Sequence, residues 1–185
     1  MKITDVLDEI RPTLQHKCNV ALLDFLAGFN ARRQVTIGGQ TYLRFLGSRD
    51  RDTMFLPLGE RGASAPIFSC SHEMREFYSA FDGLREAEPP TCGHFVSCRE
   101  VGTVGEEFDT QIFVSFRRYA DCPIVFVATN GDQMIQTQEG GFVWCVHSEG
   151  AVREAANSFA RLLSNYIAYR SIGDGWPFDS YGRSS

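Results

Sequence analysis

Three short strand-like segments in the second half of the chain constrain its fold more than any other feature. PIVFVA at 123–128 is rich in β-branched and aromatic residues, DQMIQT at 132–137 alternates, and FVWCVH at 142–147 again favours a strand. Asn130-Gly131 and Gly140-Gly141 separate them, and both dipeptides favour tight turns. The pattern predicts a three-stranded antiparallel meander over 123–147.

Helical patterns lie on both sides of this meander. We expect helices from Ile3, from Pro12 to about Asn30, over 72–83 with Ser71 as N-cap, and after Ser148, where apolar residues between Val152 and Ile167 form a broad face. Because the strands cluster between helical ends, the chain is predicted to be α+β. A largely antiparallel, curved sheet should be flanked by N-terminal helices and a C-terminal amphipathic helix.

Other segments have the composition of strands. We expect a hairpin over 34–46 that turns at Gly38-Gly39, and further strands at 53–58, 95–101 and 111–116. The acidic, Pro-containing stretch LREAEPPTCGHF at 84–95 is expected to be a loop. The length of 185 residues suits one domain, which we expect over 1–170 with a loose tail at 171–185.

The net charge of −5 is concentrated in the middle of the chain, where residues 61–110 carry four basic and nine acidic side chains. An acidic surface disfavours nucleic acid and favours a basic partner, although a solvated loop is the simpler explanation. Arg117-Arg118 beside Tyr119 is too small a basic patch to indicate nucleic-acid binding. No apolar stretch approaches the roughly 20 residues of a spanning helix, so no membrane association is expected.

Cysteine and histidine offer the only recognisable metal-binding pattern. Cys70-x-His72 and Cys92-x-His94, with Cys98 close behind, contain the ligand types that zinc prefers. The two pairs are far apart and lack the usual spacing, so we expect no metal or other cofactor and interpret these residues as unrelated. No nucleophile elbow or phosphate-binding loop is present, and the chain is not expected to be an enzyme. Without an apolar signal region, the cysteines indicate a reducing, cytoplasmic compartment.

The order of motifs over residues 70–170 is similar to that of a known family. EFYSAFDGLRE is followed by FVSCREV, by a strand pair that turns on a polar glycine motif, and by the helix SFARLLSNYIAYR. Gly83, Glu100-Val101, Asn130-Gly131-Asp132 and Ser158-Phe159 are the matching positions. This order resembles the SUKH superfamily of Smi/Knr-like domains.

The resemblance implies a non-catalytic α+β domain that binds proteins. Many bacterial members of the family look like immunity proteins, which neutralise a cognate toxin, often a nuclease, by binding it. A regulatory scaffold, or a small Cys/His metal-binding protein or enzyme, is the alternative. The candidate partner-binding residues are the acidic side chains expected in loops of the middle segment, namely Asp82, Glu86, Glu88, Glu100, Glu106, Glu107 and Asp109. The oligomeric state is not indicated by the sequence.

Overall fold

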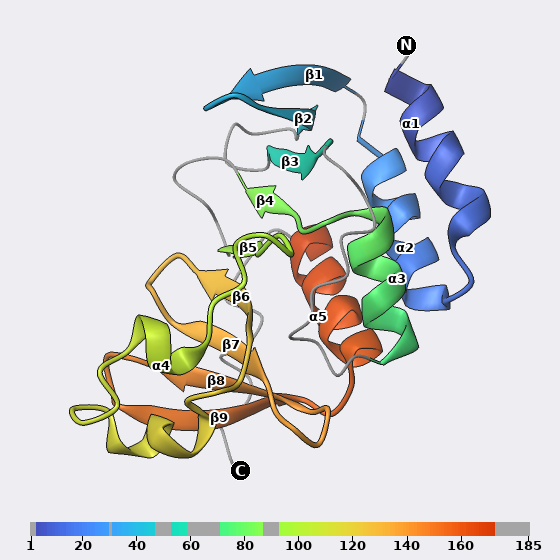
Figure 1. The fold of residues 1–185 in the computed structure, drawn as a ribbon. Coiled ribbons are helices and arrows are strands. Elements are labelled where there is room, and N and C mark those ends of the chain that lie inside the picture. The colour runs from blue at the N-terminus through green and yellow to red at the C-terminus, as the bar shows by residue number, and fades with distance from the viewer. Residues whose placement is uncertain (1–2, 30, 47–52, 59–70, 87–92, 173–185) are drawn as a thin grey trace.

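The computed structural model describes residues 3–29, 31–46, 53–58, 71–86 and 93–172, and these form an α+β fold with two antiparallel sheets. The fold class predicted from the sequence is therefore confirmed (Figure 1). The helices are α1 (Ile3–Ile10), η1 (Arg11–Thr13), α2 (Lys17–Ala27), α3 (His72–Ala80), α4 (Val104–Glu107), η3 (Val114–Tyr119) and α5 (Phe159–Ile172). None of the helices in the described part of the chain is long and apolar enough to cross a membrane.

The N-terminal sheet has the strand order β1-β2-β3-β4. Its strands are β1 (Ala31–Ile37), β2 (Gln40–Leu46), β3 (Met54–Pro57) and β4 (Arg85–Glu86). The predicted hairpin is confirmed: Gly38 and Gly39 have φ angles of 57° and 83°, the left-handed pair that a two-residue type I′ turn requires. The strand predicted at 53–58 is also present, whereas β4 lies in a stretch predicted to be a loop.

The second sheet has the order β5-β6-β7-β8-β9. Its strands are β5 (Gly93–Phe95), β6 (Ile124–Ala128), β7 (Gln133–Gln136), β8 (Phe142–Val146) and β9 (Ala151–Ala156). The predicted meander is confirmed as β6, β7 and β8. An antiparallel bridge between Leu84 and Phe95 connects this sheet to the chain just before β4.

Three segments differ from the secondary structure expected from the sequence. Residues 95–101 were expected to form a strand, but β5 ends at Phe95 and residues 98–100 form a turn. The segment AVREAA was expected to belong to the last helix, but it pairs with β8 as the edge strand β9, and α5 begins only at Phe159. Backbone pairing with the edge of β8 outweighs the helical propensity of the alanine, glutamate and arginine residues in this segment. Residues 111–116 were expected to form a strand, but they lie in a turn and in η3.

The helix boundaries near the N-terminus also differ from those expected. Pro12 lies in η1 rather than in the first turn of the second helix, which begins at Lys17. Ser71 caps α3 as predicted, because its side chain accepts a hydrogen bond from the N–H of Met74 at 3.3 Å.

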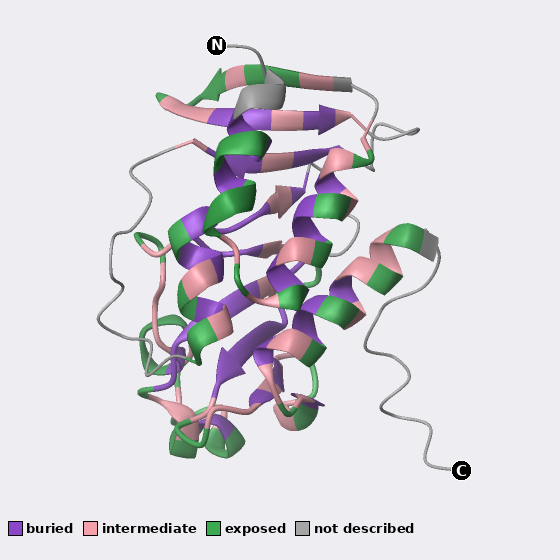
Figure 2. Ribbon diagram, turned by 90° about the vertical axis from the view of Figure 1, so that its right-hand side faces the viewer, coloured by how far each residue is buried: buried purple, intermediate pink, exposed green. Residues whose placement is uncertain are grey.

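The main hydrophobic core lies between the helices and the inward faces of both sheets. The Phe77 ring of α3 is completely buried. Its centre lies 5.4 Å from the centre of the Phe95 ring and 5.2 Å from that of the Phe159 ring. These contacts join α3, β5 and α5. Figure 2 shows the buried strands behind the half-buried faces of the helices. A smaller second cluster lies on the opposite face of the five-stranded sheet.

Candidate functional site

Residues 104–120 form an outer layer on the face of the five-stranded sheet that α5 does not cover (Figure 1). The layer contains α4 and η3, and its two ends are joined where the N–H of Gly105 donates to the carbonyl of Ala120 at 2.8 Å. Buried Val104 and Phe116 pack on Ile135 of β7 and Cys145 of β8. This second cluster accounts for the two phenylalanines in residues 111–116, because Phe113 and Phe116 cover a sheet face although the segment forms no strand.

The outer layer nevertheless exposes two large apolar side chains. Ile112 is 72% exposed and Val114 is 62% exposed, whereas the aromatic residues beside them turn towards the sheet. The rings of Phe113 and Phe116 are stacked 5.1 Å apart beneath this surface. Isolated exposed apolar residues are common, but two of them on one short turn that is supported from below form a rigid apolar projection.

Three of the predicted acidic residues lie in the same layer and are exposed. They are Glu106, Glu107 and Asp109. Glu106 completes a capping box, since its carboxylate accepts from the N–H of Thr103 at 2.7 Å. Asp109 accepts from the N–H of Gln111 at 2.8 Å. The exposed carboxylates therefore lie in the same layer as the exposed apolar pair, whose exposure was not expected from the sequence.

Glu100 is also exposed but has a partner within the chain. Its carboxylate accepts from the Arg85 guanidinium at 2.5 Å, and both side chains are about two-fifths exposed. An ion pair of this kind contributes little to stability, about 1 kcal/mol or less, and leaves Glu100 accessible.

The expected position of Asp82 in a solvated loop is wrong. Asp82 is buried, with a φ of 48°, and its carboxylate accepts from the N–H of Cys98 at 2.9 Å. It fixes the corner after α3, where Gly83 follows with a φ of 94°. Asp82 is therefore a structural residue of the turn and offers no surface to a partner.

The same correction applies to Glu86, which belongs to β4. Its carboxylate is completely shielded from solvent and lies 3.3 Å from Nη1 of Arg170 on α5. It also accepts from the N–H of Gly93 at 3.2 Å and from the hydroxyl of Tyr166 at 3.3 Å. Glu86 thus joins both sheets to the last helix. Glu88, the remaining candidate, lies outside the described residues.

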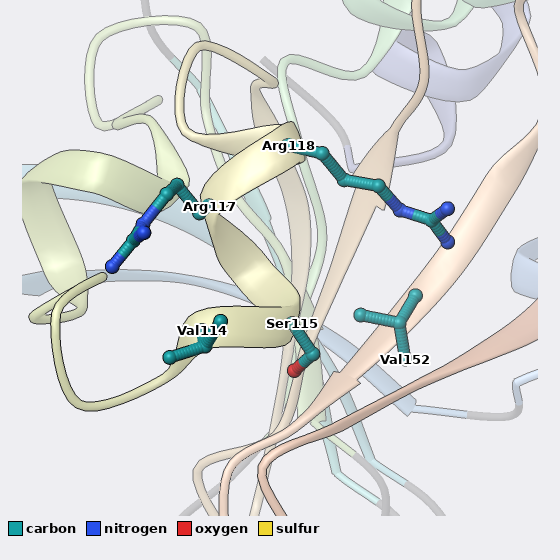
Figure 3. A pocket seen from close by; sticks show the side chains of 5 residues that line it. All are labelled: Val114, Ser115, Arg117, Arg118 and Val152. Atoms are coloured by element: carbon teal, nitrogen blue, oxygen red, sulfur yellow. The ribbon is translucent and has the colours of Figure 1, made fainter.

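A shallow, open pocket of about 660 Å³ lies between η3 and β9 (Figure 3). It is lined by Val114, Ser115, Arg117, Arg118 and Val152. Figure 3 shows Arg118 extending towards the side of Val152, while Arg117 points the opposite way. The Arg118 guanidinium lies 4.6 Å from the centre of the Tyr119 ring. The basic pair therefore gives this edge of the outer layer positive charge and an aromatic contact.

A histidine and an aspartate are in direct contact between the β6–β7 turn and the end of β8. Oδ1 of Asp132 lies 2.9 Å from Nδ1 of His147 and accepts from the His147 backbone N–H at 3.0 Å. Asn130 and Asp132 bond to each other in the β6–β7 turn, and Gly131 lies against the imidazole ring. A histidine with an aspartate on its Nδ1 supplies two of the three groups of a catalytic triad, but no hydroxyl or thiol of a described residue bonds to Nε2 of His147. The contact fixes the turn to the end of β8.

Cysteine chemistry is suppressed by burial at three positions. Burial raises the pKa of the Cys18, Cys122 and Cys145 thiols, and that of Cys145 reaches about 12. These three and Cys98 are free thiols. Cys70 and Cys92, the first residues of the two Cys-x-His pairs, lie outside the described residues. Within the described ranges, no three His, Cys, Asp or Glu side chains are grouped as a metal site would need.

The fold and the layer define an α+β protein with two antiparallel sheets and a charged, partly apolar outer surface. No protein-family model, curated protein or solved structure matches the chain. The SUKH resemblance therefore remains a prediction from the sequence.

Proposed function

We propose that this chain is a non-catalytic protein-binding module that receives its partner on the outer layer. The observation that carries the proposal is the exposure of Ile112 and Val114 above a well-packed aromatic cluster. Rigid apolar side chains surrounded by polar groups are typical of the centre of a protein interface.

The acidic end of the outer layer favours a basic partner, whereas Arg117 and Arg118 give its other end positive charge. The exposed carboxylates of Glu106, Glu107 and Asp109 lie in the same layer as the apolar pair, and Glu100 is exposed nearby in the chain. Complementary charge raises association rates and selects between partners. With the SUKH resemblance, this favours an immunity protein that binds and neutralises a basic, nuclease-like toxin. Free thiols at four cysteines fit a reducing cytoplasm as the place where it acts.

The proposal is tested by affinity capture with two matched variants. Tagged wild-type protein, Ile112→Asp/Val114→Asp and Ile37→Asp are used to capture partners from extracts of the cell that produces the chain. Ile37 is the matched control, because it is also a large apolar residue and is 53% exposed. It lies at the tip of the β1–β2 hairpin in the other sheet, away from the outer layer (Figure 1). We expect one basic protein to be retained by the wild type and by Ile37→Asp and to be lost from the double variant.

Association kinetics then test the contribution of charge. Reversing Glu106 and Glu107 to arginine should slow association with the captured protein by about tenfold at low salt and less at high salt. Equal loss of the partner from both apolar variants, or unchanged kinetics after charge reversal, would remove the outer layer as the binding surface.

Growth rescue separates an immunity protein from a regulatory scaffold. The captured protein is expressed alone and together with the wild-type chain or with Ile112→Asp/Val114→Asp. An immunity protein restores growth only in the wild-type form. A captured protein that is harmless when expressed alone indicates the scaffold instead.

A further inference from the structure

A row of basic and aromatic side chains crosses the outward face of the N-terminal sheet. Arg33 of β1 lies opposite Arg44 of β2, Arg44 opposite Phe55 of β3, and Phe55 opposite Arg85 of β4. Residues that are directly opposed across antiparallel strands point to the same face, so these four side chains form one row. Phe45, the next residue on β2, is completely buried in the main core, which places the row on the face away from the helices.

Two of the three charges in this row, those of Arg33 and Arg44, have no counter-charge among the described residues. Like charges directly opposite each other on a sheet are destabilising, and Arg33 and Arg44 are such a pair. Among the described residues, no carboxylate forms an ion pair with either of them, whereas Arg85 is paired with Glu100. Nε of Arg44 is shielded from solvent and has no hydrogen-bond partner. Its guanidinium lies 5.9 Å from the centre of the Phe55 ring, which holds it in place.

The row ends at an open sheet edge. β1 has seven residues and is the first strand of its sheet, so among the described residues only β2 pairs with it. The two-residue turn makes Ile37 and Gln40 the hydrogen-bonded closing pair of the hairpin. Because hydrogen-bonded and non-hydrogen-bonded pairs alternate, the backbone N–H groups of Gln34 and Thr36 point away from β2. Figure 1 shows β1 at the margin of the molecule.

We propose that β1 accepts an extended acidic segment of another protein as an additional strand. Backbone hydrogen bonds to Gln34 and Thr36 provide affinity, and a carboxylate beside Arg33 continues the row with the counter-charge that it lacks. This surface belongs to the N-terminal sheet, so the inference is independent of the partner proposed for the outer layer.

The same observations disfavour other occupants. A second copy of β1 would bring another Arg32-Arg33 pair against this edge and add to the repulsion. Single-stranded nucleic acid needs a free aromatic face for base stacking, but Arg44 covers Phe55, and the Tyr42 ring contacts it edge-on at 6.1 Å.

Peptide binding tests the proposal with the full-length protein. The probe is a fluorescein-labelled peptide, Thr-Glu-Val-Glu-Val-Glu-Thr, which matches the length of β1, and its control replaces each Glu with Gln. Anisotropy is measured at low and high salt, with oligothymidylate as a third probe. We expect the acidic peptide to bind at least about fivefold more tightly than the Gln peptide, and salt to weaken its binding.

Four variants locate the binding. Arg33→Gln and Arg44→Gln should each weaken the acidic peptide about threefold or more, and Gln34→Pro should abolish binding because it removes an outward N–H. Arg75→Gln, a change of an exposed arginine on α3, should leave binding unchanged. The Arg33→Gln protein should melt at the same or a higher temperature at low salt, because a like-charge contact is relieved.

Three results would overturn the proposal. They are equal binding of the Glu and Gln peptides, tighter binding of oligothymidylate than of the acidic peptide, and a dimer of the free protein in light scattering that Gln34→Pro converts to a monomer. Loss of peptide binding in Arg75→Gln would overturn it as well, since the attraction would then come from overall charge. None of these results bears on Ile112 or Val114, so the two proposals fail separately.

Discussion

Replacement of Glu86 by alanine should destabilise the protein far more than its position in an acidic segment suggests. The Glu86 carboxylate is completely shielded from solvent and the Arg170 side chain is 4% exposed. Removal of one partner leaves the other charge buried without compensation, which costs about 3–5 kcal/mol. The N–H of Gly93 and the hydroxyl of Tyr166 lose an acceptor at the same time.

Thermal and urea unfolding measure the loss of stability in Glu86→Ala. For a chain of this length, a loss of about 3–5 kcal/mol corresponds to a fall of roughly 6–20 °C in melting temperature. Glu86→Gln retains an oxygen that can accept from Gly93, and it should cost less than Glu86→Ala. The urea m-value should stay constant if only the folded state is affected.

Glu100→Ala is the matched control, because Glu100 also pairs with an arginine but remains exposed. It should change the free energy of unfolding by no more than about 1 kcal/mol. A Glu86→Ala protein within about 1 kcal/mol of the wild type would refute the reasoning, since it would show that β4 and α5 are not held together by this contact.

Three further predictions concern stability. Because burial raises the pKa of the Cys145 thiol to about 12, its contribution to stability is constant below about pH 9 and falls as the pH rises from there towards about 12. Cys145→Ala should flatten this part of the curve of unfolding free energy against pH, and equal slopes for the two proteins would contradict the prediction. Asp132→Ala should cost about 1–3 kcal/mol in urea unfolding, because two hydrogen bonds to His147 are lost, and a neutral result would show that the contact does not fix the turn. Gly93→Ala should cost at least about 2 kcal/mol in thermal unfolding, because its φ is 140° and a Cβ would lie 2.1 Å from the carbonyl oxygen of Val127; a wild-type melting temperature would disprove the close approach.

Local sequence determined much of the secondary structure. The β1–β2 hairpin follows from two adjacent glycines, which adopt the positive φ angles of its turn without steric cost. The meander of β6 to β8 follows from β-branched and aromatic runs separated by glycine turns, and the start of α3 follows from the Ser71 cap. In each case the deciding interaction lies within a few residues of the chain, so the sequence pattern is sufficient.

Only the tertiary structure decided the remaining elements and the candidate sites. The apolar spacing of residues 151–156 fits a helix, but these residues form a strand because they pair with β8. Residues 111–116 have the composition of a strand, but they form a turn and part of η3 that pack on the sheet face beneath them. Glu86 and Glu106 carry the same charge in the same acidic segment, yet one is buried against Arg170 and the other is exposed in a capping box. Burial and partners depend on residues far away in the chain, because they are set by packing rather than by neighbouring sequence. The row of Arg33, Arg44 and Phe55 likewise exists only once strand register places them side by side.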